Sequence, residues 1–132
     1  MTTPSESNAA VVRLFWERVQ ARDWSGARAL LADDFVAEWP HSRERFRGAD
    51  TFIDMNRAYP EGWTITILRI LADANTAVSE IRVDQSPEVF FAASFFELTP
   101  DARIARATEY WVTSPYEDPA LWRAPWSEPL EV

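Results

Sequence analysis

The stretch EVFFAASFFELTPDARIARATEYWV, residues 88–112, decides the fold. Two runs rich in aromatic and β-branched residues, 88–98 and 103–112, flank the sequence TPDA, a pattern typical of a β-hairpin. Because side chains alternate across a strand, Ala105, Ala107, Glu109 and Trp111 are expected to share one face. A carboxyl group beside an indole and small residues is unusual both for a core and for a surface in water. Glu109 is therefore either an acid or base in a pocket or a charge without a chemical task.

The other predicted strands lie upstream of this hairpin. Residues 63–73 and 76–84 alternate in the same way and form a second hairpin around the turn ADAN. A shorter strand covers 34–40, where Pro40 ends it. The polar sequence HSRERFRG, residues 41–48, is predicted to be a loop.

Three helices are predicted in the first half of the chain. The first begins at Ser5 or Ser7 and runs to about Arg22, since apolar residues recur at spacings of three and four. The second covers 26–34 and the third covers 49–59. Helices followed by long antiparallel strands indicate an α+β domain, in which the helices cover one face of a curved sheet. A cleft between two such layers is a common place for a small molecule to bind.

The composition fits one domain, residues 1–132, and argues against several kinds of function. The net charge is −8 and all thirteen basic residues are Arg, so nucleic acid is an unsuitable partner and no Lys is present for Schiff-base chemistry. The chain has no Cys and a single His, which argues against thiolate and His-rich metal sites. We expect no metal, no cofactor and no membrane partner, because no apolar run is long enough to span a bilayer. The N-terminus lacks the features of a signal peptide, so a cytoplasmic location is expected.

The two ends of the chain are expected to differ in character. Residues 1–7 are predicted to be a loose N-terminus. Residues 114–132 carry four Pro and two Trp, a composition too apolar for a disordered tail and too rich in Pro for a helix. This segment is expected to pack on the fold or on a neighbouring subunit, where Trp122 and Trp126 suit a dimer contact.

Over residues 8–115 the chain resembles the nuclear transport factor 2-like superfamily, in particular its SnoaL-like and ketosteroid-isomerase-like branch. The resemblance rests on RDWSGARALLADDFVAEWP, then FRGADTF, then SFFELTPDARIARATEYWV, in this order and spacing. It implies a conical, cystatin-like fold whose curved mixed or antiparallel sheet and three N-terminal helices enclose a pocket, usually in a homodimer. Members include isomerases, polyketide cyclases, epoxide hydrolases, dehydratases and binding proteins, so the resemblance implies a pocket more strongly than a reaction.

The resemblance also locates the positions of ketosteroid isomerase chemistry. The catalytic carboxylate of that family corresponds to Trp39, its oxyanion-binding Tyr to Phe15, and its protonated second acid to Ser94. All three groups are absent, which argues against steroid isomerisation. The Trp of the last strand is retained as Trp111, and Glu109 is the best counterpart of the single acid that SnoaL-like cyclases use.

Three residues are candidates for acid or base chemistry. An apolar cleft would raise the pKa of Glu109 toward values useful for catalysis. The alternative is a structural ion pair between Glu109 and Arg106 or Arg82. Glu80 lies on one strand face with Arg82 and either lines the cavity or is solvated. His41 either shuttles protons at the pocket mouth or is a surface His.

The candidate ligand-binding residues are mostly aromatic side chains that either form core or touch the cavity. They are Phe15, Trp16, Trp39, Tyr59, Trp63, Arg82, Ser94, Phe96 and Trp111.

Three functions remain open at this stage. The first is a cofactor-independent enzyme that isomerises, cyclises, dehydrates or hydrates an apolar, cyclic or polyketide-like molecule. The second is a ligand-binding or accessory protein that keeps the pocket without catalysis. The third is a structural dimer module, which predicts a pocket filled by its own side chains.

Overall fold

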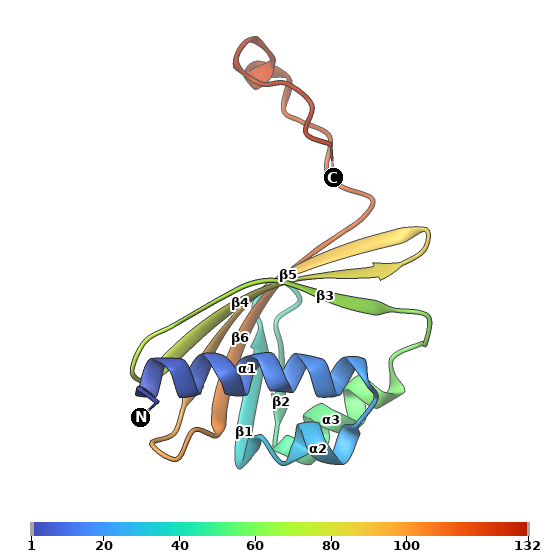
Figure 1. Ribbon diagram of the computed structural model, residues 1–132. Coiled ribbons are helices and arrows are strands. Elements are labelled where there is room, and N and C mark those ends of the chain that lie inside the picture. Colours follow the sequence, from blue (N-terminus) through green and yellow to red (C-terminus); the bar gives the residue numbers. More distant parts are fainter. Residues whose placement is uncertain (1, 132) are drawn as a thin grey trace.

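A six-stranded mixed sheet forms the body of the protein, and helices cover one of its faces (Figure 1). The computed structural model describes residues 2–131. The strands run in the order β2-β1-β6-β5-β4-β3; β1 pairs with β6 in parallel and the other neighbours are antiparallel. The strands are β1 (Leu31–Trp39), β2 (Glu44–Arg47), β3 (Thr64–Ala72), β4 (Thr76–Gln85), β5 (Glu88–Leu98) and β6 (Ile104–Thr113). The predicted α+β class is confirmed.

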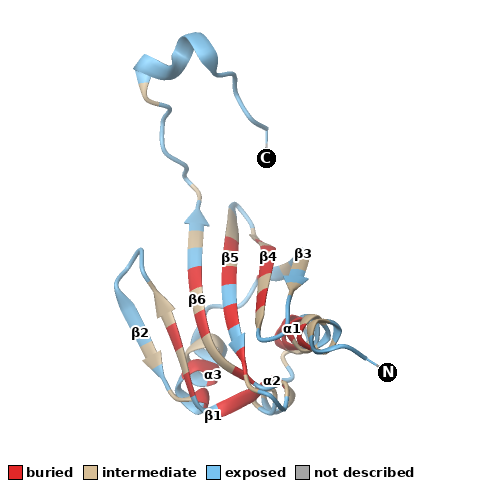
Figure 2. Ribbon diagram, turned by 90° about the vertical axis from the view of Figure 1, so that its left-hand side faces the viewer, coloured by how far each residue is buried: buried red, intermediate tan, exposed pale blue. Residues whose placement is uncertain are grey.

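The face of the sheet that meets the helices is called the inner face here, and the opposite one the outer face. Register places Ser79 of β4 opposite Ser94 of β5, and Ser94 opposite Glu109 of β6. Buried and exposed residues alternate along these strands (Figure 2). The row Ser79–Ser94–Glu109 therefore crosses the middle of the inner face.

The first helix, α1 (Pro4–Gln20), packs along the sheet through a stripe that includes Val12, Phe15 and Val19. Its start differs from the prediction, because the Thr3 hydroxyl caps the helix by accepting from the Glu6 N–H and Pro4 occupies the first turn. Pro is well suited to that position, since its missing N–H would have no partner there. The expectation of a loose segment over residues 4–7 is therefore wrong.

The second helix, α2 (Trp24–Arg28), is shorter than predicted. The Asp23 side chain caps it by accepting from the N–H of Gly26. The sequence LLAD, which we assigned to the helix, lies mostly in β1, where Leu31 pairs with Ile104 and is fully buried. Sheet pairing overrides the helical preference of this segment.

Residues 44–47 form β2 rather than a loop. Phe46 of this strand contacts Trp39 edge to face, with ring centroids 4.7 Å apart. Gly48 then turns the chain into α3 (Ala49–Ala58), which agrees with the predicted third helix. Helix α3 brings Phe52, Met55 and Asn56 toward the sheet.

The C-terminal arm, residues 114–131, projects away from the body and contains only the short 3-10 helix η1 (Leu121–Trp126) (Figures 1 and 2). Trp122 and Trp126 remain 72% and 81% exposed. The expectation that this segment packs on its own fold is wrong, whereas packing on a neighbouring subunit stays a prediction. No helix within residues 2–131 is both long and apolar enough to cross a membrane.

We predict that Gly48→Ala lowers the free energy of unfolding by roughly 1–3 kcal/mol. Gly48 has φ 93° and ψ 142°, a conformation that side chains disfavour. A Cβ there would meet Thr51 Oγ1 only at 3.7 Å, so the cost comes from the backbone and not from a clash. Urea denaturation of the two proteins measures the difference, and equal midpoints would contradict the assignment.

Candidate active site

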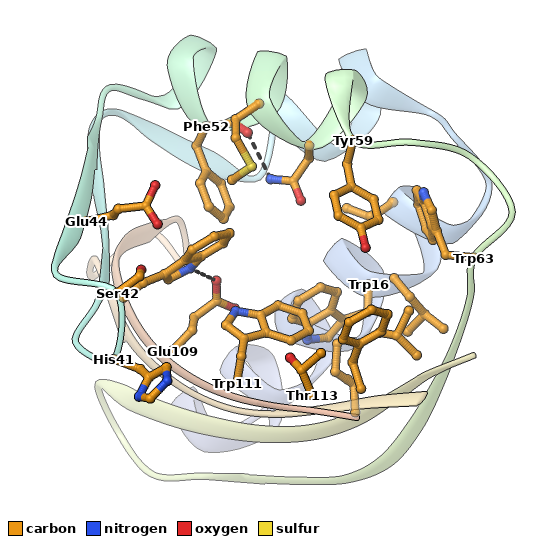
Figure 3. A pocket seen from close by; sticks show the side chains of 18 of the residues that line it. Trp16, His41, Ser42, Glu44, Phe52, Tyr59, Trp63, Glu109, Trp111 and Thr113 are labelled. Atoms are coloured by element: carbon orange, nitrogen blue, oxygen red, sulfur yellow. Dashed lines mark hydrogen bonds between the residues drawn. The ribbon is translucent and has the colours of Figure 1, made fainter. Parts of the chain in front are cut away.

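A cavity of about 310 Å³ lies between the helices and the inner face of the sheet (Figure 3). This volume is within the range of small-molecule pockets. Its wall is largely apolar, and a pocket filled by its own side chains, as the structural-module hypothesis predicted, is not what the structure shows. The lining residues are Phe15, Trp16, Val19, Trp39, His41, Ser42, Glu44, Phe52, Met55, Asn56, Tyr59, Trp63, Ile65, Ile81, Val83, Phe90, Glu109, Trp111 and Thr113.

Glu109 is the buried acidic group of this wall. Its side chain comes from the middle of β6 and is 2% exposed. The indole N–H of Trp39 donates to Oε1 at 3.0 Å, and the hydroxyl of Ser94 donates to Oε2 at 2.6 Å. Figure 3 shows the Glu109 carboxyl group beside the ring of Trp111 at the edge of the cavity.

The surroundings of Glu109 raise its pKa above the ordinary value. Burial is the dominant cause, because it disfavours the charged form, while the hydrogen bonds from Ser94 and Trp39 act in the opposite direction. Arg106 and Arg82, the two proposed ion-pair partners, instead bind Glu38 at 2.5 Å and Asp84 at 3.0 Å. The structural ion-pair interpretation of Glu109 is therefore wrong.

Buried polar groups on the neighbouring strands β4 and β5 lie next to Glu109 on the inner face. Ser94 and Ser79 are fully buried neighbours on the inner face. The indole N–H of Trp16 donates to Ser79 Oγ at 2.9 Å. Two tryptophans of the pocket wall, Trp16 and Trp39, thus hold the two ends of the polar row Ser79–Ser94–Glu109.

Two further indole groups of the wall lack this support. The Nε1 atoms of Trp63 and Trp111 are buried and have no hydrogen-bond partner in the described part of the chain. The Arg22 guanidinium stacks on Trp63 at 3.3 Å from the ring centroid. A buried donor without an acceptor costs roughly 1–3 kcal/mol, so both positions would favour an acceptor.

The structure brings together most of the predicted ligand-binding residues. Phe15, Trp16, Trp39, Tyr59, Trp63 and Trp111 line the cavity. His41 also lines it, from the turn between β1 and β2. The Tyr59 hydroxyl donates to Gln85 Oε1 at 2.7 Å, and burial raises the pKa of Tyr59.

Four predicted site residues lie elsewhere. Glu80 and Arg82 point to the outer face, where Glu80 pairs with Arg69 and Arg82 pairs with Asp84, because the apolar residues of β4 occupy the inner face. Phe96 lies behind Trp16 at a ring distance of 6.4 Å, and Ser94 lies behind Glu109. These four residues are not among those that line the cavity, although Ser94 donates a hydrogen bond to Glu109.

Several lining residues were missed by sequence reasoning. Ile81 and Val83 alternate with Glu80 and Arg82, so the apolar parity of β4 was a usable signal for the inner face. Met55 and Asn56 of α3 carried no comparable signal. Among residues 2–131, no group of three or more His, Asp or Glu side chains is placed to hold a metal ion.

The fold and the pocket define an α+β domain of the nuclear transport factor 2-like superfamily. The sequence profile of the SnoaL-like domain family matches residues 12–107, and the chain belongs to this family. A search of curated proteins gives no match to the sequence.

Solved structures support the same assignment. A candidate ketosteroid isomerase of Kribbella flavida DSM 17836 is 29% identical, with a TM-score of 0.88 over 98% of this chain and 94% of that one. An LEH-like epoxide hydrolase of M. tuberculosis is 25% identical, with a TM-score of 0.70 over 82% of this chain and 84% of that one. An NTF2-like protein of unknown function from Burkholderia xenovorans LB400 is 20% identical, with a TM-score of 0.79 over 96% and 97%, and shows the shared fold.

We predict that Glu109 makes the protein less stable as the pH rises. The folded state holds the Glu109 proton more tightly than the unfolded state, so stability is highest below the ordinary pKa of 4.5 and falls as the pH rises through the folded value. The difference in unfolding free energy between the wild type and Glu109→Gln, measured from pH 4 to pH 9, isolates this contribution. A difference that does not change with pH would contradict it.

We also predict that Trp39→Phe raises the pKa of Glu109 further, because it removes an N–H that stabilises the carboxylate. Trp111→Phe is the matched control, since the Trp111 N–H has no hydrogen-bond partner among residues 2–131. NMR titration of the ¹³C-labelled Glu109 carboxyl measures both variants. Equal shifts in the two proteins would show that ring packing, and not the hydrogen bond, sets the pKa.

Proposed function

We propose that the protein binds a small, largely apolar cyclic or polyketide-like molecule in this pocket and that Glu109 serves as a general acid and base on it. The observation that carries the proposal is a buried carboxyl group, free of any ion pair in the described chain, at the wall of an apolar cavity. A raised pKa brings such a group closer to the pH at which acid and base catalysis is efficient.

The pocket wall is complementary to a ligand that has a flat apolar surface and a few oxygen atoms. Aromatic rings from α1, β1 and β6 would stack on or against a ring system. The unpaired N–H groups of Trp63 and Trp111 favour ligand oxygens as acceptors, because pairing would remove the cost of leaving these donors buried.

The proposed chemistry moves protons without a cofactor. In an isomerisation, the Glu109 carboxylate takes a proton from a carbon next to a carbonyl group, and the resulting acid returns it to another carbon of the conjugated system. The atoms balance, and Glu109 ends in its starting state. The donors Trp39 and Ser94 hold the carboxyl in place during both steps.

A second function, binding without catalysis, is favoured by one specific observation. The positions that correspond to the three catalytic groups of ketosteroid isomerase hold Phe15, Trp39 and Ser94. The similar structures bear the names isomerase and epoxide hydrolase, so the family resemblance alone does not choose a reaction.

The test starts from a panel of cyclic ketones, enones and aromatic polyketides, screened by thermal shift and by pocket Trp fluorescence. For a compound that is both bound and converted, we predict that Glu109→Gln lowers kcat at least 100-fold and changes the Kd less than fivefold, because the amide keeps the shape of the side chain but cannot act as a general acid or base near neutral pH. Ser42→Ala, at the cavity edge, is the matched control and is expected to keep most activity. Binding of several compounds with no conversion by the wild type would favour the binding protein.

A further inference from the structure

The pocket wall that faces the sheet carries one amide among apolar and aromatic side chains. The four residues that α3 and its C-cap present to the cavity share one helix face at spacings of three and four. Three of them are Phe52, Met55 and Tyr59, and the fourth is the partly buried Asn56. Figure 3 shows Phe52 and Tyr59 across the cavity from Glu109, and Asn56 lies between them along the chain.

The Asn56 amide is held in a way that leaves its oxygen unpaired. Its Nδ2 donates to the Phe52 carbonyl, one helical turn earlier, at 2.8 Å (Figure 3). Its Oδ1 lies on the opposite side of the same amide carbon and accepts no hydrogen bond from residues 2–131. An amide oxygen has two lone pairs, so Asn56 offers an acceptor at the wall of the pocket.

Helix α3 has a fixed position relative to the sheet. At its start, the Gly48 N–H donates to the Phe35 carbonyl of β1 at 2.6 Å. One turn further on, the Phe52 ring packs on the Phe35 ring with centroids 5.1 Å apart. The helix face that carries Asn56 is therefore held in place, which is what specific recognition of a ligand group requires.

Asn is an unfavourable residue at this position on local grounds. It has a lower helix propensity than Leu or Met, because its side chain competes for hydrogen bonds with the backbone. In a largely apolar wall, the amide also loses hydration that its bond to Phe52 replaces only in part. A position at which both local preferences are violated is a candidate for a functional role.

The charges of the wall limit which ligand group Asn56 could bind. Glu44 and Glu109 line the cavity, and no Arg of the described chain does. A carboxylate or phosphate on the ligand would meet two acidic groups without a basic partner, and a largely apolar wall disfavours a full positive charge. A neutral hydroxyl group fits these conditions, because its O–H can be donated to Oδ1.

We propose that Asn56 is a specificity-determining residue that accepts a hydrogen bond from a neutral hydroxyl group of the ligand. The ligand is thus a hydroxylated cyclic molecule whose hydroxyl group meets α3 while its other side meets Glu109 on the sheet. The proposal rests on the proposed function for a cyclic ligand in this pocket, but not for its conversion. Binding constants test Asn56 and turnover tests Glu109, so either role can fail while the other stands.

The binding of matched ligand pairs tests the role of Asn56. The probes are 2-tetralones with a hydroxyl group at each free position of the aromatic ring in turn, each paired with the methyl compound of the same position. For at least one position, we expect the wild type to bind the hydroxyl compound more tightly. Asn56→Leu should then lower the ratio of the methyl Kd to the hydroxyl Kd at least tenfold, because the hydroxyl group would lie unpaired against an apolar side chain.

Isothermal titration calorimetry measures both Kd values for each variant, so a general loss of affinity cancels in the ratio. Met55→Leu is the matched control, because Met55 lines the same wall without an amide; it should leave the ratio unchanged, as should Glu109→Gln. Circular dichroism checks that each variant folds. A wild type that prefers the hydroxyl compound at no position, or a ratio that Asn56→Leu does not change, would overturn the proposal.

NMR of the wild type tests the bond at the atom itself. The chain has three Asn residues, so ¹³Cγ-labelled asparagine gives three signals, and sequential assignment identifies that of Asn56. The preferred hydroxyl compound is expected to shift this signal more than its methyl partner does, because a hydrogen bond to Oδ1 polarises the amide carbonyl. Equal shifts with the two compounds would show that the hydroxyl group binds elsewhere.

Discussion

The burial of the Glu109 carboxyl without a basic partner is the constraint on which the rest of the site depends. A buried charge is costly unless it is paired, and the two Arg residues considered as partners of Glu109 are engaged on the outer face, where Arg106 binds Glu38 and Arg82 binds Asp84. Two neutral donors, Trp39 and Ser94, supply part of the missing stabilisation. The sheet thus separates a charged outer face from an inner face whose buried acidic group, Glu109, has a pKa raised by burial.

The same constraint explains how this pocket differs from that of the isomerases it resembles. The resemblance implies that Trp39 and Ser94 stand at the positions of the two acids of ketosteroid isomerase, and in this structure both donate to Glu109. The buried acid of this pocket is on β6, and Trp39 and Ser94 are its hydrogen-bond donors. A pocket without the isomerase groups can therefore still contain a buried carboxyl group, here Glu109.

The alternation of side chains along the sequence predicts most of the strands and the position of Glu109. It does not predict all of the other residues that line the pocket. The strand pair 88–98 and 103–112 placed Glu109 beside Trp111 on one face, and the structure bears out that placement. The same parity, applied to β4, favours Ile81 over Glu80 for the inner face, because apolar residues alternate there with charged ones. Strand β2 was missed because four residues, with Phe46 as their one partly buried contact, give too short a pattern.

The hydrogen-bond donors around Glu109 limit where a proton taken up by its carboxyl group can go. Glu109 has one oxygen bound to Trp39 and the other to Ser94, so a proton taken from a ligand must be held within this short network or returned to the ligand. The buried row continues only to Ser79 and Trp16, which offer no group that ionises near neutral pH. Return to the same molecule is the simplest way to restore the carboxylate, and this favours reactions that rearrange a ligand over reactions that leave a net proton in the pocket.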